Sequence, residues 1–407
     1  MKQQSASSSL AGKRIRLGGL DAMRALAVIG MVYMHVSPTG WLEAAPFVDK
    51  PAVLASFEQA IAGRAMSLFV LMAGVSIALM TGGHAPHTGA RLAVDRRRIA
   101  IRAGVLFLIS LVVDQLSGMS LSILAHYSLW LLLLIPLLRL SPRTLFSAAA
   151  IAAALTPVFS FVVMNYGREW AISPLNSNGS TAFGLALLVR PQDWPAMVKQ
   201  LLVGGGFQTP YAIPLLLAGL GIGRLNLTSG AVRWRLALTG GALVIVSWLV
   251  SRFALGPLGA EQALAEMMAA NGPFLQPWRS LLTLPPHQLY AMSIPMAPYM
   301  LGIGLLMLTG LLVLLDQVAW QRILFPVTAT GRLALTWYAA HQVFLQRAVE
   351  GPPYAFTIFA GMIVFALIFS PSWLRLVSRG PLEWLMHRTS VMVIPQERRH
   401  VTETETR

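Results

Sequence analysis

Long apolar stretches alternate with short polar segments along the chain, and this pattern constrains the fold more than any other feature. Ten of the stretches are long enough to cross a hydrocarbon core of about 30 Å as α-helices. They cover residues 19–37, 64–82, 99–117, 120–138, 144–165, 209–225, 234–254, 292–315, 332–349 and 355–376. The sequence therefore predicts an all-α integral membrane protein, a polytopic bundle of about ten transmembrane helices.

The composition supports a membrane location and excludes several kinds of site. Hydrophobic residues make up 56% of the 407 residues and charged residues only 12%, whereas soluble domains carry about 25% charged residues. The net charge of +15 could indicate a nucleic-acid partner, but the basic residues lie in short loops between apolar stretches, which is typical of membrane topology. We therefore predict no nucleic-acid partner. The absence of cysteine excludes disulfides, thiolate metal sites and cysteine nucleophiles, and we predict no metal cofactor.

The distribution of lysine and arginine predicts the orientation in the membrane. If the N-terminus lies inside, the inner segments hold most of the 31 basic residues. By the positive-inside rule, both termini then lie in the cytoplasm, and we predict a multi-pass protein of the bacterial cytoplasmic membrane. Residues 13–390 form one transmembrane domain, while residues 1–12 and 391–407 are polar and are predicted to be disordered.

The first apolar stretch contains three polar residues that are expensive to place in a membrane. Asp21 and Arg24 lie at its inner end, and His35 follows eleven residues after Arg24. Eleven residues make about three helical turns, so Arg24 and His35 share one face and lie roughly 16 Å apart along the axis. Asp21 and Arg24 fit an interfacial ion pair or a foothold for an anionic group from the cytoplasm. His35 fits a structural interfacial histidine or a general base for an O–H or N–H nucleophile.

Five further ionisable residues lie near the ends of other predicted helices. Arg64, Asp114, His126, His287 and His341 are each candidates for a functional site, and not all of them will be catalytic. Asp114 fits a carboxylate that orients a histidine, or one that accepts a hydrogen bond from a loop amide. His341 is the stronger second histidine candidate and His126 the weaker.

Two other sequence features have both a functional and a structural interpretation. The basic cluster Arg96–Arg98 could contact the phosphates of a soluble cofactor or an anionic lipid, although topology alone explains such a cluster. The small residues Ala73–Ser76 permit close helix packing or the approach of a thin ligand arm. Two long outer connections, about 166–208 and 255–291, shape a substrate site or are variable surface.

Several of these segments together resemble known membrane proteins. Residues 20–27, with ten residues between Arg24 and His35, resemble the arginine-to-histidine signature of the membrane acyltransferase-three proteins. They also resemble the opening helix of heparan-alpha-glucosaminide N-acetyltransferase and of the bacterial YeiB-type proteins. Residues 63–76 are similar to the second helix of the YeiB group, and residues 331–341 and 380–385 are similar to its C-terminal motifs.

The resemblance implies an acyltransferase that moves an acyl group, in the first instance acetyl, from cytoplasmic acyl-CoA to a hydroxyl or amine at the outer face. The acceptor would be a glycan, a lipid-linked sugar or a small metabolite. By position, Arg24 would help to hold the CoA donor and His35 would be the catalytic base. The glucosaminide enzyme has its catalytic histidine in the loop after this helix, but residues 36–63 contain no histidine here, which favours His35 itself.

The full set of expected site residues extends these two positions. The expected catalytic residues are His35, Asp114 and His341, and the expected acyl-CoA-binding residues are Asp21, Arg24, Arg64, Ser76 and Arg97. The expected partners are the lipid bilayer, acyl-CoA and the acceptor. The sequence leaves open whether the protein forms a homodimer. The main alternative is a multi-span transporter or exporter of a small molecule or lipid, in which the same charges serve proton coupling or substrate binding. A third alternative is a membrane scaffold without catalysis, against which the charges within the spans argue.

Overall fold

The computed structural model describes residues 17–36, 64–118, 122–167, 183–203, 209–269, 277–284, 293–348 and 355–392, and every regular element in these ranges is a helix. The helices of twelve or more residues are α1 (Gly18–Val36), α3 (Arg64–Met80), α4 (Gly89–Ser117), α5 (Ile123–Leu134), α6 (Pro142–Tyr166), α9 (Thr209–Gly223), α10 (Gly230–Leu255), α12 (Met296–Leu314), α15 (Ala334–Ala348), α16 (Ala355–Leu376) and α17 (Pro381–Met392). The shorter ones are α8 (Trp194–Leu202), α11 (Ala260–Ala269), α13 (Val318–Ile323), α14 (Phe325–Arg332) and the 3₁₀ segments η2 (Ile135–Arg139), η3 (Gly184–Leu188), η4 (Pro191–Asp193) and η5 (Trp278–Leu282).

The all-helical membrane fold is confirmed, and each of the ten predicted stretches coincides with one of the long helices. Within the described residues, six helices are long and apolar enough to cross a membrane: α1, α4, α6, α10, α12 and α16. Three shorter apolar helices, α3, α5 with η2, and α9, lie beside them. The full count of ten spans and the cytoplasmic location of both termini stay predictions.

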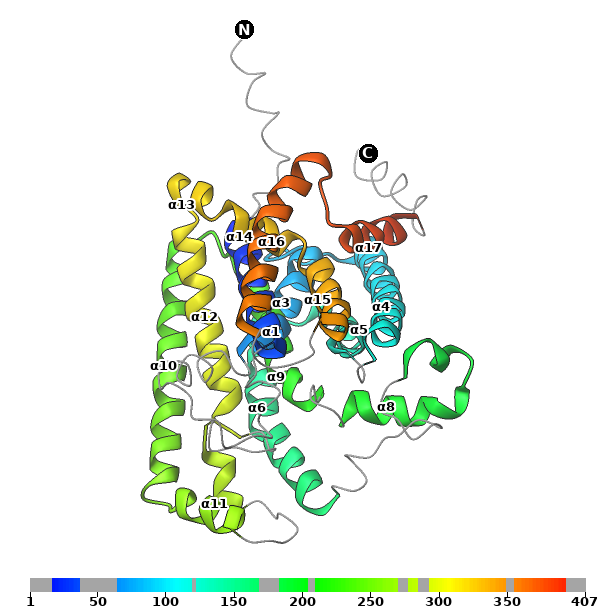
Figure 1. Ribbon diagram of the computed structural model, residues 1–407. Coiled ribbons are helices and arrows are strands. Elements are labelled where there is room, and N and C mark those ends of the chain that lie inside the picture. The colour runs from blue at the N-terminus through cyan, green and yellow to red at the C-terminus, as the bar shows by residue number, and fades with distance from the viewer. Residues whose placement is uncertain are drawn as a thin grey trace.

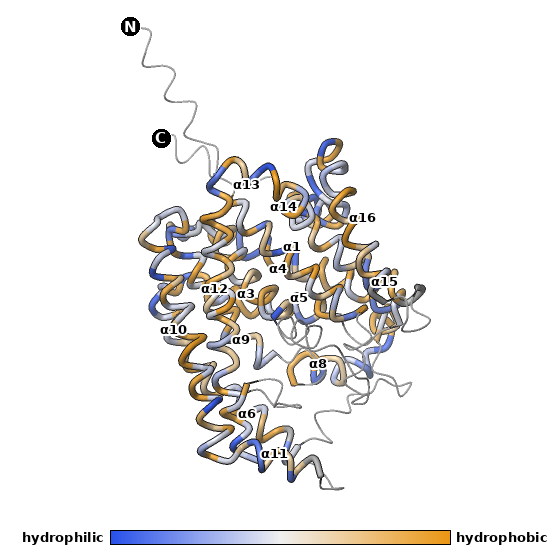
Figure 2. Tube along the Cα trace, turned by 60° about the vertical axis from the view of Figure 1, so that its left-hand side comes forward, coloured by the Kyte–Doolittle hydropathy of each residue, from blue (hydrophilic) through white to orange (hydrophobic). Residues whose placement is uncertain are grey.

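Helix α1 is the central element of the bundle (Figure 1). It packs against α3, α12, α14, α15 and α16, and 67% of its most apolar window is buried within the protein. The corresponding fractions for α6 and α16 are only 17% and 11%, so these two helices expose most of their apolar surface. Figure 2 shows that apolar residues continue along the outer helices α10 and α12. The polar residues of α1 are therefore surrounded by protein, whereas α6 and α16 present hydrocarbon-compatible surfaces to the membrane.

Glycines allow the central helices to approach closely. A Cβ atom at Gly74 of α3 would collide with the backbone of Leu216, and one at Gly219 of α9 would collide with the carbonyl of Leu71. A Cβ atom at Gly331 of α14 would likewise collide with the backbone of α1. The contact at Gly74 agrees with the interpretation of residues 73–76 as a site of close helix packing. Only glycine lets two helix backbones come this near.

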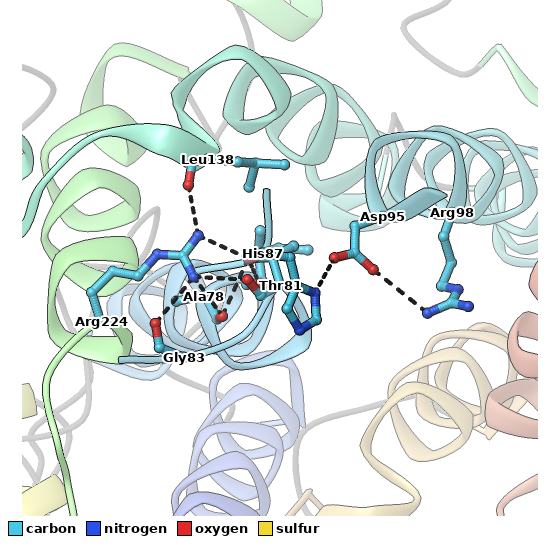
Figure 3. A network of polar contacts seen from close by, with 9 residues as sticks. Ala78, Thr81, Gly83, His87, Asp95, Arg98, Leu138 and Arg224 are labelled. Atoms are coloured by element: carbon cyan, nitrogen blue, oxygen red, sulfur yellow. Dashed lines mark hydrogen bonds and ion pairs between the residues drawn. The ribbon is translucent and has the colours of Figure 1, made fainter. Parts of the chain in front are cut away.

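A buried arginine joins the ends of α3, α9 and η2 (Figure 3). Arg224 is 4% exposed and donates hydrogen bonds to the backbone carbonyls of Thr81 (3.1 Å) and Leu138 (2.8 Å) and to the Thr81 hydroxyl (2.8 Å). It also donates to the carbonyls of Ala78 and Gly83. Arg224 therefore stabilises the fold in addition to the topological role predicted for basic residues. Its guanidinium donates hydrogen bonds to carbonyls that the ends of α3 and η2 leave without helical partners.

A second polar group lies beside this arginine, at the start of α4 (Figure 3). His87 Nδ1 lies 2.6 Å from Asp95 Oδ2, and Arg98 Nη1 lies 3.6 Å from Asp95 Oδ1. Asp95 is only 3% exposed, and its buried carboxylate is paired with these two neighbours. Together with Arg224, they fix the turn between α3 and α4.

Candidate functional site

Two histidines that are distant in the sequence meet at one end of α1. His35 Nδ1 lies 2.9 Å from His341 Nε2, which belongs to α15. The two rings are stacked, with centroids 5.2 Å apart and an angle of 10° between their planes. His341 is 1% exposed and His35 is partly buried. The sequence indicated both residues separately, and the fold joins them into a pair.

The neighbours of His341 determine which nitrogens carry protons in the neutral pair. His341 Nδ1 lies 3.2 Å from the carbonyl oxygen of Trp337, which can only accept, so this nitrogen carries the proton. His341 Nε2 is then the acceptor for the Nδ1–H of His35. This arrangement leaves Nε2 of His35 in the unprotonated, basic form. In this arrangement His35 carries the basic nitrogen of the pair, and His341 accepts its hydrogen bond.

Gln342 and Tyr338 complete the surroundings of the pair. The Gln342 amide nitrogen lies 3.3 Å from His341 Nε2 and 3.2 Å from His35 Nδ1, and it donates to the Tyr338 hydroxyl at 3.4 Å. The Tyr338 ring packs edge-on against the His341 ring, with centroids 5.1 Å apart. Both Gln342 and Tyr338 are buried. They restrict the rotamers of the two imidazoles, which fixes the direction of the basic nitrogen.

Arg24 is held at the other end of α1 by two short contacts. Its Nη1 lies 3.2 Å from Asp21 Oδ1, and its Nη2 donates to the Ser76 hydroxyl at 2.6 Å. Ser76 in turn donates to the Met72 carbonyl at 2.5 Å. The Arg24 side chain is 31% exposed, whereas Asp21 is buried. The guanidinium is therefore fixed by α1 and α3 and still presents part of its surface to a cavity.

That cavity has a volume of about 280 Å³ and lies between α1, α3, α4, α5, α14, α15 and α17. Three guanidinium groups from three helices, those of Arg24, Arg102 and Arg332, belong to its lining. Tyr338, the neighbour of His341, also lines it. The cavity therefore extends from the arginine end of α1 to Tyr338, while His35 and His341 are not among its lining residues. The rest of its lining is mainly apolar: Phe69, Ala73, Ile77, Leu106, Ile123, Leu124, Leu131, Ala334, Leu335 and Met386, with Ser76, Tyr127, Gly331 and Glu383.

The arginines of the cavity are suited to an anionic ligand. Arg102 donates to the sulfur of Met80 at 3.0 Å, and within the described residues its Nε has no hydrogen-bond partner. Arg332 donates to the Ser378 carbonyl at 3.0 Å. The contact with Met80 does not neutralise the charge of Arg102. The described lining holds three arginines and one carboxylate, that of Glu383, so its formal charge is positive, which favours phosphate or carboxylate groups.

Glu383 of α17 is the acidic residue of the lining, and it caps the start of α15. Its Oε1 accepts from the backbone amides of Leu335 (2.8 Å) and Thr336 (3.2 Å), and its Oε2 accepts from the Thr336 hydroxyl at 2.6 Å. Burial raises the pKa of Glu383 above the usual value for glutamate, while these hydrogen bonds lower it in part. The cap anchors α17 against the helix that carries Tyr338 and His341.

Several expected site residues lie elsewhere. Arg64 contacts the Tyr299 hydroxyl at 3.3 Å and does not line the cavity, and the exposed Arg97 does not line it either. Asp114 accepts from the Ser122 amide at 3.0 Å, which matches the loop interpretation, and no hydrogen bond to a histidine is seen for it within the described residues. His126 Nδ1 lies 3.4 Å from the Ser122 carbonyl and outside the histidine pair. His287 falls outside the described residues, as do large parts of both long outer connections. The roles predicted for Arg64, Arg97 and Asp114 in binding or catalysis stay predictions.

Five residues of the site were not singled out from the sequence: Arg102, Arg332, Tyr338, Gln342 and Glu383. Gln342 directly follows His341, and Arg332 and Glu383 lie within the two C-terminal segments that carry the family resemblance. Arg102 lies inside an apolar stretch, where a charged residue is itself a signal of function. Among the described residues, no group of three or more histidine, aspartate or glutamate side chains could hold a metal ion.

Two family models match the chain. Residues 16–181 match the family described as heparan-alpha-glucosaminide N-acetyltransferase, catalytic, and residues 267–392 match the family described as protein of unknown function (DUF418). The first match includes Arg24, His35 and Arg102, and the second includes His341 and Glu383. No curated protein matches the chain.

The fold and the first match together indicate a multi-pass membrane protein with an acetyltransferase-like function. The two matches support the resemblance of this chain to heparan-alpha-glucosaminide N-acetyltransferase and to the YeiB-type proteins. The histidine pair joins α1, which lies in the first matched region, to α15, which lies in the second.

Proposed function

We propose that the protein is a membrane acyltransferase that takes an acyl group, in the first instance acetyl, from cytoplasmic acyl-CoA. It delivers this group to a hydroxyl or amine acceptor at the outer face of a bacterial cytoplasmic membrane. The observation that carries the proposal is the cavity that links the arginines at one end of α1 to Tyr338, the packing partner of His341, at the other. An anionic carrier with a long, thin, mostly apolar arm fits such a cavity better than a compact ion does.

The arginine end would hold the phosphate-bearing part of acyl-CoA. Guanidinium groups bind phosphate oxygens through charge-assisted hydrogen bonds, and Arg24 is already oriented by Asp21 and Ser76. Arg102 and Arg332 supply two further cations on the same cavity. The roughly 16 Å between Arg24 and His35 along α1, at about 1.5 Å per residue, is a distance that the pantetheine arm can cover.

His35 would act as the general base. Its basic Nε2 takes the proton of the acceptor hydroxyl or amine as the acceptor oxygen or nitrogen attacks the thioester carbonyl. The new ester or amide bond forms, the bond between the carbonyl carbon and sulfur breaks, and the thiolate of CoA receives the proton from His35. The positive charge that His35 carries in between is stabilised by its hydrogen bond to the neutral Nε2 of His341.

Acetyl transfer from labelled donor tests the proposal. Purified protein is mixed with radiolabelled acetyl-CoA and a cell-envelope extract, and both binding and label transfer are measured. We expect His35→Ala to bind acetyl-CoA but to transfer no label, because the base is lost while the arginines remain. We expect Arg24→Gln to weaken binding, with Arg143→Gln, an exposed arginine at the start of α6, as the matched control.

The same preparation distinguishes the enzyme from a transporter. If acetyl-CoA is neither bound nor consumed by the wild type, and proteoliposomes instead show flux of a small molecule or lipid, the acyltransferase proposal is wrong. If Arg24→Gln and Arg143→Gln weaken binding equally, the donor does not bind in the arginine-lined cavity.

A further inference from the structure

A second cavity, of about 370 Å³, lies between α6, α9, α10 and α12. None of its lining residues lines the arginine-lined cavity. Helix α3 borders the first cavity and α9 borders the second, and these two helices are packed closely through Gly74 and Gly219. We call this second cavity the lateral crevice.

Small residues on one face of α6 keep the lateral crevice open. Ala149, Ala150, Ala153 and Ala154 all line it, and their spacing puts them on one side of the helix. Ala149 forms part of the buried floor, whereas Ala150 and Ala154 are exposed at the rim. The space that larger side chains would fill therefore stays empty of protein and is accessible from the outer surface of α6.

The chemistry of the lining excludes water and ions as occupants. Among the described residues, Thr239 of α10 is the one lining residue with a polar side chain, and none of the described lining residues is charged. A buried water needs two to four polar partners, which this lining does not provide. An empty crevice would also forfeit the dispersion contacts of its walls. An apolar occupant is therefore favoured.

The position of the crevice identifies the apolar occupant. Helices α6 and α10 are both long enough to span the membrane, and only 17% and 22% of their most apolar windows are buried within the protein. Ile294, Ala297 and Pro298 line the crevice from the start of α12. The four alanines of α6, and Thr239 and Leu243 of α10, lie about two or more turns from either end of these long helices, which places them at the depth of the hydrocarbon core. At that depth the medium outside the crevice consists of lipid tails.

We propose that the lateral crevice binds one acyl chain of a bilayer phospholipid, which enters between α6 and α10. The acyl chain fills the space that the small alanine side chains of α6 leave empty. It contacts both the α6–α9 pair and the α10–α12 pair. Because it binds the folded bundle, it stabilises that bundle by mass action. This site is independent of acyl transfer, so its failure leaves the proposed function untouched.

Photocrosslinking tests the site directly. The full-length protein is reconstituted into nanodiscs of phosphatidylcholine that carries a diazirine in the middle of one acyl chain, and cross-linked residues are mapped by mass spectrometry. We expect labels on Phe146, Leu243 and Leu301 of the crevice. In the double variant Ala150→Leu/Ala153→Leu these labels fall to background. In the control Leu155→Phe, on the opposite and 63% exposed face of α6, they persist.

Thermal stability gives a second readout that a merely misfolded variant cannot mimic. Detergent washing that strips phospholipid should lower the Tm of the wild type, and added phosphatidylcholine should restore it. The filled variant should retain a cooperative melt whose Tm no longer responds to lipid, and if it does not fold, Ala150→Leu alone takes its place. The proposal is overturned if crevice labels survive the filling, if the wild type is labelled only around Leu155, or if an isoprenoid phosphate displaces the phospholipid from the crevice.

Discussion

Replacing His341 with leucine should slow acyl transfer without unfolding the protein. Leucine is apolar and fills much of the space of the imidazole, so the packing of Tyr338 is largely kept. The substitution removes the acceptor for the Nδ1–H of His35, which lies 2.9 Å from His341 Nε2 in the native pair. His35 then loses both its fixed tautomer and the partner that stabilises its protonated form.

The size of the effect follows from that hydrogen bond. A hydrogen bond to a charged group contributes about 1.5–3 kcal/mol, and each 1.36 kcal/mol changes a rate about tenfold. We therefore expect kcat to fall by about 10- to 150-fold, because the bond becomes charge-assisted only when His35 has taken the proton. KM for acetyl-CoA should change little, because the arginines that would bind the donor are untouched.

The assay is the release of CoA thiol in the presence of envelope extract, with His126→Leu as the matched control. His126 is also a buried histidine, at 1% exposure, but it lies on α5 and outside the pair. His341→Gln, whose amide oxygen can still accept from His35, should be intermediate. A wild-type kcat in His341→Leu, or an equal loss of kcat in His126→Leu at equal Tm, would contradict this role of His341.

Three further substitutions test the scaffold around the site. Gly331→Val should destabilise the bundle by about 1–3 kcal/mol through overpacking against α1; the melt should show this, whereas Gly310→Val, which meets open space, should not. Arg224→Gln should cost about 3 kcal/mol or more, since carbonyls at the α3 and η2 ends lose a charged donor, and the exposed Arg143→Gln should leave the Tm unchanged. Because burial raises the pKa of Glu383, protonation favours the folded state, so its contribution to stability is lost as pH rises through that raised pKa. Glu383→Gln should flatten this part of the Tm–pH profile, and an unaltered slope would contradict the assignment.

The fold class could be predicted from the sequence because apolar length alone identifies a membrane helix. The ends of α1 were also predictable, since Asp21, Arg24 and His35 are costly residues in an apolar stretch. The pairing of His35 with His341 could not be derived from spacing, because 306 residues separate them and only the packing of α15 against α1 brings them together.

Burial and partner choice limit what the sequence reveals about the other polar residues. Asp114 and Arg64 have the same residue types as residues of the candidate site, but Asp114 accepts a hydrogen bond from the Ser122 amide and Arg64 contacts the Tyr299 hydroxyl. Arg102 and Glu383 reach the cavity because α4 and α17 pack beside each other. Such contacts depend on the rotation of each helix about its axis, which an almost uniformly apolar helix does not encode in its hydrophobic pattern.

In the proposed function, α1 connects a donor supplied from the cytoplasm to an acceptor on the other side of the membrane. Oriented proteoliposomes with envelope extract on one side and radiolabelled acetyl-CoA on the other test this connection. With acetyl-CoA on the cytoplasmic side of the protein, we expect thiol release on that side and labelled acceptor on the opposite side, with both lost in His35→Ala. Label that appears only on the side of the donor, or transfer that persists in His35→Ala, would contradict it.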